Sequence, residues 1–278
     1  MDYELLDSGE KRKLERYGEF LLVRPDPQVV WQKNLSLEIW DKADAVFGTG
    51  WKKKSTMPDT WVVEMGGYKF EVSLKNFKHT GVFPEQIENW AFIENSLKIK
   101  NSQNNKLVKI LNLFGYTGGA TLAAAKVGAE VTHVDASKPA ITAAKENTKL
   151  NGLEEAPIRW ILDDCQKFVA REARRGIKYD GIIMDPPVFG RGTKGEVWKI
   201  EEDLLLLLRS VKNILSPNFK FIILNGYASG YTSVAYAQTL SSVFGLPIKE
   251  IEHGELTIKE SSLRGFSLPA GMFARYSK

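Results

Sequence analysis

The sequence has few of the features on which disulfide, metal and membrane chemistry depend. Cys165 is its single cysteine, so no intrachain disulfide can form and a reducing compartment fits best. The three histidines are scattered, and no His, Cys or Asp spacing indicates a metal site. The first residues lack the cationic start and apolar core of a signal peptide, and the densest apolar cluster, residues 204–208, is too short to span a bilayer. The sequence therefore predicts a cytoplasmic protein that uses neither a metal nor a membrane.

The chain also has neither a strong net charge nor a low-complexity tract. Its 278 residues carry a net charge of +4 with a pI near 8.9, which allows a polyanionic partner without requiring one. No internal repeat is visible, and 43% hydrophobic with 26% charged residues is ordinary for a folded protein. This length accommodates one large domain, or a medium domain and a smaller one.

Composition changes near residue 100. Five of the seven tryptophans precede it, and residues 61–65 and 68–74 are strand-like segments that flank Gly66-Gly67, a strong hairpin signal. The polar run at 101–105 is the best boundary. We therefore expect a small β-rich N-terminal domain over residues 1–100 and a second domain over residues 101–278.

In the second domain, strand-like and helix-like segments alternate. Strands are expected at 107–114, 130–134, 157–162, 179–184 and 219–224. Helices are expected at 118–127, 138–150, 166–175, 197–215 and 233–244. Such alternation is typical of βαβ units, so the expected fold class is α/β, a Rossmann-like, doubly wound and mainly parallel sheet. Two final strands, 248–258 and 268–276, predict an antiparallel hairpin at the C-terminus.

A glycine-rich turn follows the first strand of this alternating region. Gly115, Gly118 and Gly119 let the backbone approach a ligand, and the helix that follows presents free N–H groups. Asp135 ends the second strand, 20 residues after Gly115, where a carboxylate accepts hydrogen bonds from ribose hydroxyls. Since ligands of open α/β sheets lie beyond the carboxyl ends of the strands, these residues predict a nucleoside-containing cofactor.

The third strand ends in a pair of acidic residues, Asp163 and Asp164. We expect Asp164 to accept from an adenine amino group and Asp163 to cap the next helix. Each of these features alone also fits an ordinary turn or helix cap, and it is their order that favours a cofactor site. The turn lacks a complete G-x-G-x-x-G pattern, which counts against NAD.

The most informative segment is Asp185-Pro186-Pro187-Val-Phe189, which closes the strand at 179–184. The two prolines fix φ and remove two backbone donors, so the chain leaves the sheet stiffly with its carbonyls available. The carboxylate and carbonyl oxygens accept hydrogen bonds from a planar nitrogenous group while the Phe189 ring stacks on its face. Such a device suits a nucleobase or an amide, although a strand-ending turn with Phe189 in the core is the simpler alternative.

Together these segments resemble the successive motifs of class I S-adenosylmethionine-dependent methyltransferases. More closely, the chain resembles the bacterial large-subunit ribosomal RNA methyltransferases that modify cytosine C5 or guanine N7. The resemblance covers roughly residues 60–278 and rests on 112–119, 134–135, Asp164 and 185–189, with a lead-in at 78–86.

The resemblance implies S-adenosylmethionine as cofactor and RNA, in the first place ribosomal RNA, as substrate. The cofactor-binding residues that it implies are Gly81, Phe83, Asn112, Phe114, Gly115, Thr117, Gly118, Asp135, Asp164 and Asp185. The catalytic residues that it implies are Asp185, Pro186, Pro187 and Phe189.

Two departures from the family change the expected chemistry. Methylation at cytosine C5 uses a cysteine nucleophile, whereas Ala228 occupies the aligned place here and Cys165 reads as a buried filler. The family's RNA-binding N-terminal domain is not recognisable in residues 1–60. We therefore predict methylation at a base nitrogen without a cysteine adduct.

Three other functions remain open at this point. They are an NAD-dependent oxidoreductase, a catalytically silent RNA-binding module that keeps the fold, and a methyltransferase acting on protein. Two smaller expectations concern single segments. His133 should be a core residue rather than a base. Residues 190–195 should form a flexible cationic loop next to the pocket, which is either a plain solvated loop or one that contacts phosphates or closes over the substrate. The sequence gives no indication of oligomeric state.

Overall fold

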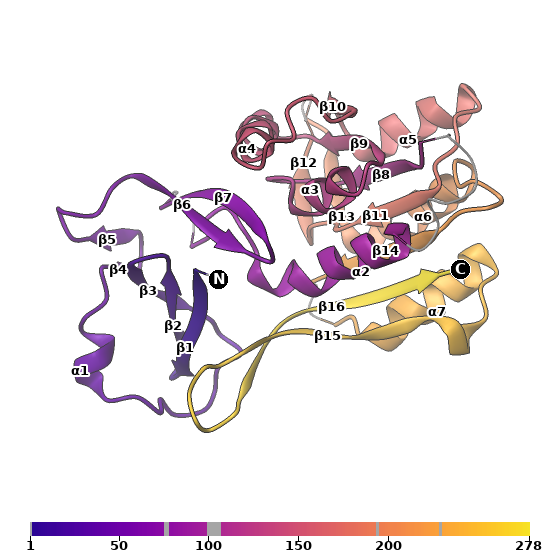
Figure 1. Ribbon diagram of the computed structural model, residues 1–278. Coiled ribbons are helices and arrows are strands. Elements are labelled where there is room, and N and C mark those ends of the chain that lie inside the picture. Colours follow the sequence, from indigo (N-terminus) through magenta and orange to yellow (C-terminus); the bar gives the residue numbers. More distant parts are fainter. Residues whose placement is uncertain (1, 75–77, 99–106, 193–194, 228–229) are drawn as a thin grey trace. The chain divides into compact units, whose positions relative to one another are not determined.

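The computed structural model describes residues 2–74, 78–98, 107–192, 195–227 and 230–278 (Figure 1). It divides into two compact units: residues 1–87 with 257–270, and residues 88–256 with 271–278. The predicted boundary segment, 101–105, falls outside the described residues, so a domain division at residue 100 stays a prediction.

The first unit consists mainly of β-strands. Its elements are β1 (Tyr3–Gly9), β2 (Arg12–Tyr17), β3 (Phe20–Pro25), α1 (Leu37–Trp40), β4 (Ala45–Phe47), β5 (Trp51–Lys53), β6 (Thr60–Met65) and β7 (Tyr68–Ser73). A five-stranded sheet runs in the order β1-β2-β3-β4-β5, with β3 and β4 parallel and the other neighbours antiparallel. β6 and β7 pair separately.

The hairpin predicted around Gly66-Gly67 is confirmed. β6 pairs antiparallel with β7, and Met65 lies opposite Tyr68 across the two-residue turn. Gly66 and Gly67 have φ values of 59° and 78°, the left-handed conformations that this kind of tight turn requires.

The first unit also includes the tip of the C-terminal hairpin, residues 257–270. Arg264 lies 3.0 Å from Asp7 and 2.6 Å from Glu260, and both carboxylates are fully buried. Because buried carboxylates are costly unless paired with a cation, this cluster fixes the tip to β1.

The second unit contains the alternating elements. They are α2 (Ile87–Lys98), β8 (Lys109–Leu113), α3 (Gly119–Lys126), β9 (Glu130–Asp135), α4 (Lys138–Leu150), β10 (Ile158–Leu162), α5 (Cys165–Arg174), β11 (Gly181–Met184), β12 (Phe189–Arg191), β13 (Val197–Lys199), α6 (Ile200–Lys212), β14 (Phe221–Gly226), α7 (Ser233–Phe244), and the parts of β15 (Glu252–Lys259) and β16 (Ser267–Ser277) that lie outside residues 257–270.

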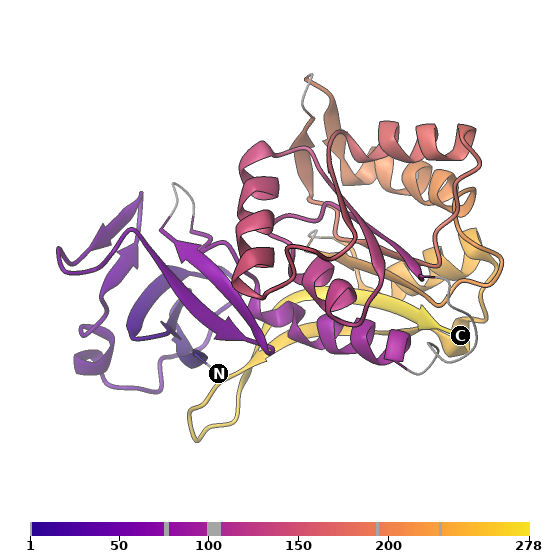
Figure 2. The ribbon, with the colours of Figure 1, turned by 45° about the horizontal axis from the view of Figure 1, so that its top comes forward.

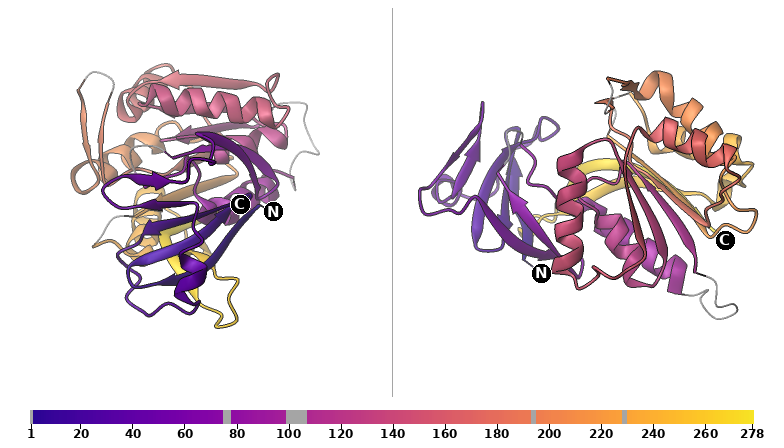
Figure 3. Two further views of the ribbon diagram at one scale, coloured as in Figure 1. Left: turned by 90° about the vertical axis from the view of Figure 1, so that its left-hand side faces the viewer. Right: turned by 90° about the horizontal axis from the view of Figure 1, so that it is seen from above.

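A seven-stranded sheet organises this unit in the order β10-β9-β8-β11-β14-β16-β15. The first five strands are parallel, and β16 pairs antiparallel with β14. α5, α6 and α7 pack beside one another on one face of the sheet, and α2, α3 and α4 cover the other (Figures 2 and 3). The Rossmann-like, mainly parallel sheet with antiparallel C-terminal strands is as predicted. Within the described ranges, none of the helices has the length and apolar character that crossing a bilayer requires.

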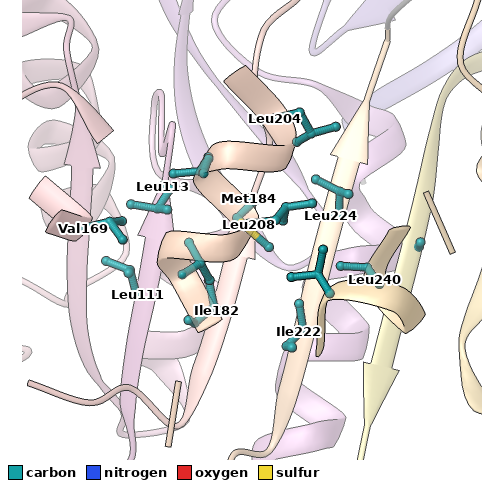
Figure 4. Close-up of a cluster of buried hydrophobic side chains, with 14 of the residues drawn as sticks. Leu111, Leu113, Val169, Ile182, Met184, Leu204, Leu208, Ile222, Leu224 and Leu240 are labelled. Carbon is teal, nitrogen blue, oxygen red and sulfur yellow. The ribbon is translucent and has the colours of Figure 1, made fainter. Parts of the chain in front are cut away.

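The main core lies between the sheet and α6. Leu204 and Leu208 of α6 lie over Leu113, Met184 and Leu224, which project from three neighbouring strands (Figure 4). All four residues of β11 are buried, as expected for a central parallel strand covered on both faces. Burying each large aliphatic side chain contributes roughly 1.5–3 kcal/mol, so this layer holds the strand ends in place.

Two expectations about residues 190–215 are wrong in detail. The predicted helix begins at Ile200, not Val197, because residues 197–199 form β13. β13 pairs antiparallel with β12, so the described part of the predicted loop at 190–195 belongs largely to a β-hairpin. Backbone pairing of Gly192 N–H with the Glu196 carbonyl, at 2.9 Å, continues that hairpin.

Candidate active site

The strand register brings the predicted motifs to one edge of the sheet, by which we mean the edge formed by the carboxyl ends of its parallel strands. Leu113 at the end of β8 lies opposite Val134 of β9 on one side and Met184 of β11 on the other. The chain therefore leaves three neighbouring strands side by side, at Phe114, Asp135 and Asp185. Since all three strands are parallel, these are their carboxyl ends, where α/β proteins bind ligands.

The turn after β8 has an unusual backbone. Phe114 and Tyr116 have φ values of 58° and 46°, and Gly118 has a φ of 93°. Left-handed φ at non-glycine residues costs about 1–3 kcal/mol each and persists where the surroundings impose it, often at functional sites. The N–H groups of this turn are used within the fold: that of Gly115 donates to the Val134 carbonyl, and that of Gly118 donates to the Gly115 carbonyl, both at 3.0 Å. The sequence reasoning identified the glycines but missed Tyr116.

The glycines of this turn also have a packing role that the sequence did not reveal. A Cβ atom on Gly115 would lie 2.5 Å from the His133 ring, and one on Gly119 would lie 2.4 Å from the Trp90 ring. Gly118 precedes α3 in a left-handed conformation. The turn is therefore seated directly on two buried rings.

Buried polar contacts support the turn from below. The side-chain amide of Asn112 donates to the Thr121 hydroxyl at 3.0 Å, and that hydroxyl lies 2.9 Å from His133 Nδ1. The Thr117 carbonyl accepts from the Asn147 amide at 2.9 Å. Asn112 and Thr117 are buried beneath the turn, and their contact with a cofactor stays a prediction. Burial lowers the pKa of His133 to about 3, so the ring is neutral, and its predicted place in the core is confirmed.

Asp135 is held by backbone donors. The N–H of Tyr116 donates to Oδ2 at 2.8 Å, and the N–H of Ser137 donates to Oδ1 at 2.7 Å. Burial raises the pKa of Asp135 above its ordinary value, and these two hydrogen bonds offset only part of that rise. Ser137, rather than Asp135, caps α4. A carboxylate that helps to shape the glycine turn is thus fixed at the end of β9.

The expectation that Asp163 caps the following helix is wrong. Asp164 caps α5 by accepting from the Lys167 N–H at 2.9 Å. Asp163 instead accepts from the Asp164 N–H at 2.9 Å and pairs with Arg171. The acceptor atom of this cap is Oδ1 of Asp164. A contact between the Asp164 carboxylate and the cofactor stays a prediction.

The acidic proline segment follows β11 directly. Pro186 is buried, Asp185 is half-buried, and Phe189 is 54% exposed, so the alternative that places Phe189 in the core is wrong. The indole N–H of Trp198 donates to the Pro187 carbonyl at 2.6 Å. The Trp198 ring also packs against Phe114, with their centroids 5.1 Å apart. Trp198 therefore connects the acidic segment with the glycine turn, a role without any local sequence signal.

Gly81 and Phe83 belong to the first unit, whereas the edge just described belongs to the second. Gly81 has a φ of 107°, which favours glycine, and the Phe83 ring lies 5.3 Å from that of His79. Their approach to a cofactor stays a prediction. Ala228, aligned with the family's cysteine, lies outside the described residues.

Similarity to known proteins extends over most of the chain. This chain is 34% identical to ribosomal RNA large subunit methyltransferase K/L of Shewanella frigidimarina over a segment that makes up 59% of this chain and 22% of that protein. It is 29% identical to ribosomal RNA large subunit methyltransferase I of Pseudoalteromonas translucida over a segment that makes up 67% of this chain and 45% of that protein. The chain thus spans less than half the length of either relative.

Solved structures share the fold. An S-adenosylmethionine-dependent methyltransferase from Agrobacterium tumefaciens is 41% identical, with a TM-score of 0.91 over 100% of this chain and 90% of that one. SMU.776, solved in complex with S-adenosylhomocysteine, is 22% identical, with a TM-score of 0.72 over 99% of this chain and 75% of that one, and shows the same fold. The family described as S-adenosylmethionine-dependent methyltransferase matches residues 10–231, so the chain belongs to that family and uses its cofactor.

Proposed function

We propose that this chain transfers a methyl group from S-adenosylmethionine to an amino nitrogen of a base in RNA, with ribosomal RNA as the first candidate. The observation that carries the proposal is the adjacency of the glycine turn and the acidic proline segment at the ends of the paired strands β8 and β11. The curated relatives, named as ribosomal RNA methyltransferases, support RNA as the substrate class.

The residues at this edge suit the cofactor. The first N–H groups of α3, which begins directly after the turn, fit carboxylate or hydroxyl oxygens, and Asp135 at the end of β9 fits ribose hydroxyls. Gly81, Phe83 and Asp164 complete the set that we propose for cofactor binding. When bound, S-adenosylmethionine supplies an electrophilic methyl group on a positively charged sulfur.

The acidic proline segment would prepare the nucleophile. An amino nitrogen conjugated to a base ring is weakly nucleophilic, and accepting its N–H hydrogens onto Asp185 and the Pro186 carbonyl increases electron density on nitrogen. The exposed Phe189 ring offers a stacking face to a base flipped out of its helix. The nitrogen–carbon bond forms as the carbon–sulfur bond breaks, and the nitrogen then loses a proton toward Asp185 or water.

The single thiol favours nitrogen over carbon as the target. Cys165 is 3% exposed at the start of α5, and burial raises the pKa of its thiol. A buried thiol that stays protonated is a poor nucleophile for adding to a pyrimidine ring. We therefore propose direct displacement without a covalent protein–base adduct.

The decisive experiment is labelled-methyl transfer from S-adenosylmethionine to RNA and to protein, both taken from a strain that lacks this chain. Incorporation into one nucleoside, identified by mass, is the expected result. Incorporation only into protein, or none into either, would overturn the RNA proposal. Formation of 5-methylcytosine would instead overturn the choice of nitrogen.

Asp135 gives a prediction about the cofactor. Replacing Asp135 with asparagine should weaken S-adenosylhomocysteine binding by about 10–100-fold in calorimetry, because a charge-assisted hydrogen bond is worth roughly 1.5–3 kcal/mol. Asp180→Asn is the matched control: its carboxylate also accepts from a backbone N–H, that of Lys109 at 3.0 Å, but it lies before β11, at the opposite edge. Equal affinities of wild type and Asp135→Asn would remove Asp135 from the site.

Trp198 gives a second prediction. Trp198→Phe keeps a ring beside Phe114 but removes the donor to the Pro187 carbonyl, so kcat should fall about tenfold through misplacement of the acidic segment. S-adenosylhomocysteine affinity should change by less than about threefold. The control is Trp61→Phe in β6, which likewise removes an indole donor to a backbone carbonyl, that of Tyr17 at 3.0 Å, and kcat should stay unchanged. If both variants retain the wild-type kcat, the indole hydrogen bond does not position the segment.

A further inference from the structure

The hydroxyl of Tyr236 is a buried polar group that needs an explanation. Tyr236 lies in the first turn of α7 and is 1% exposed. Among the residues that the structure describes, its hydroxyl has no hydrogen-bond partner. A buried hydroxyl left without a partner costs about 1–3 kcal/mol, so phenylalanine would be the more stable choice if packing alone mattered.

Gly226, the last residue of β14, shows where this hydroxyl lies. A Cβ atom on Gly226 would lie 2.0 Å from the Tyr236 hydroxyl oxygen, so only glycine leaves room for it. Met184 pairs with Leu224, which precedes Gly226 by two residues, so the hydroxyl lies where β14 ends beside β11. This is the strand end from which Asp185 departs.

The electrostatic surroundings keep this hydroxyl protonated. Burial, and then the charges of Tyr231 and Asp185, raise the pKa of Tyr236 to about 12. The group is therefore a hydrogen-bond donor at neutral pH, and the Asp185 carboxylate is close enough to influence it. The Oδ1 atom of Asp185 is itself buried.

We propose that Tyr236 is a positioning residue for methyl transfer: when the target base binds, its hydroxyl donates a hydrogen bond to the Asp185 carboxylate. One carboxylate oxygen is then fixed on the protein side, and the other faces the amino group of the base. This inference rests on the proposed function, because it gives Asp185 an amino group to accept from. It explains why a buried tyrosine and a strand-ending glycine occur together at this edge.

The test is Tyr236→Phe, which removes only the oxygen atom. We expect kcat to fall about 10–100-fold, as for a misplaced catalytic group, while S-adenosylhomocysteine affinity and melting temperature stay the same or rise. Losing a donor to a carboxylate makes that carboxylate easier to protonate, so the acid limb of the pH–rate profile should move to higher pH. A merely structural hydroxyl would change neither kcat nor the profile.

Tyr179→Phe is the matched control. Tyr179 is equally buried, but its hydroxyl donates to Glu172 at 2.8 Å, and it lies before β11, at the opposite edge of the sheet. That variant should lose stability and keep its kcat. Wild-type kcat and an unchanged acid limb in Tyr236→Phe would overturn the proposal for Tyr236, whereas absence of methyl transfer by the wild type would overturn the proposed function itself.

Discussion

Replacing Asp185 with asparagine is expected to lower kcat for methyl transfer by about three orders of magnitude. The carboxylate has two oxygens that accept N–H hydrogens, whereas the asparagine amide replaces one of them with an NH2 group, which donates and opposes the amino group of the base. A positioned proton acceptor contributes typically 10²–10⁴ in rate, and an opposing donor removes that contribution. S-adenosylhomocysteine binding should fall less than tenfold, because most of the proposed cofactor contacts come from β8 and β9.

The measurement for Asp185→Asn is single-turnover methyl transfer to RNA, with cofactor affinity determined in parallel by calorimetry. Asp180→Asn is again the control, since it removes one negative charge from the other end of the same strand. If Asp185→Asn kept more than a tenth of the wild-type rate, the carboxylate would not be the acceptor. A similar loss in both variants would instead indicate a general effect of net charge.

The course of the main sheet is predictable from sequence because each of its parallel strands is a buried apolar run. β11, for example, contains only Gly, Ile and Met, and all four residues are buried. Strand, turn and helix alternate at fixed spacing, and right-handed connections then bring the carboxyl ends to one edge. The adjacency of Phe114, Asp135 and Asp185 thus follows from the sequence pattern and a general rule about parallel sheets.

Contacts between residues far apart in sequence are not predictable in the same way. The tip at 257–270 belongs to the first unit through Arg264, whose partner Asp7 is 257 positions away, and nothing local to either residue indicates the pair. Trp198 is a similar case. It continues the apolar pattern of the following helix, but it is in β13, where the indole binds the Pro187 carbonyl.

Single-residue assignments fail for a different reason. Asp163 and Asp164 are chemically identical and adjacent, so propensity alone cannot decide which of them caps α5. The backbone conformation determines the cap. Asp164 has φ −66° and ψ 131°, the extended conformation of a capping residue, and its side chain accepts from the N–H of Lys167, three residues later. The packing role of Gly115 was equally invisible, because it depends on a ring 18 positions later in the chain.

Replacing Gly115 with alanine is expected to impair both folding and cofactor binding. The new Cβ would lie 2.5 Å from the His133 ring, which is fully buried, lies 2.9 Å from the Thr121 hydroxyl and packs on Trp160 with centroids 4.9 Å apart. Because the ring has no space to move, the turn must shift instead. Overpacking of this kind costs about 1–3 kcal/mol, which should lower the melting temperature by several degrees. Displacing the turn by about an ångström should weaken S-adenosylhomocysteine binding about 100-fold.

Gly50→Ala is the matched control for Gly115→Ala, because a Cβ there meets nothing within 4 Å and its φ is compatible with alanine. It should leave melting temperature and affinity unchanged. The double variant Gly115→Ala with His133→Ala tests the mechanism, since removing the ring makes space for the new methyl group. Its loss of stability should be smaller than the sum of the two single losses. Strict additivity, together with normal cofactor affinity in Gly115→Ala, would mean that the His133 ring does not determine where the turn lies.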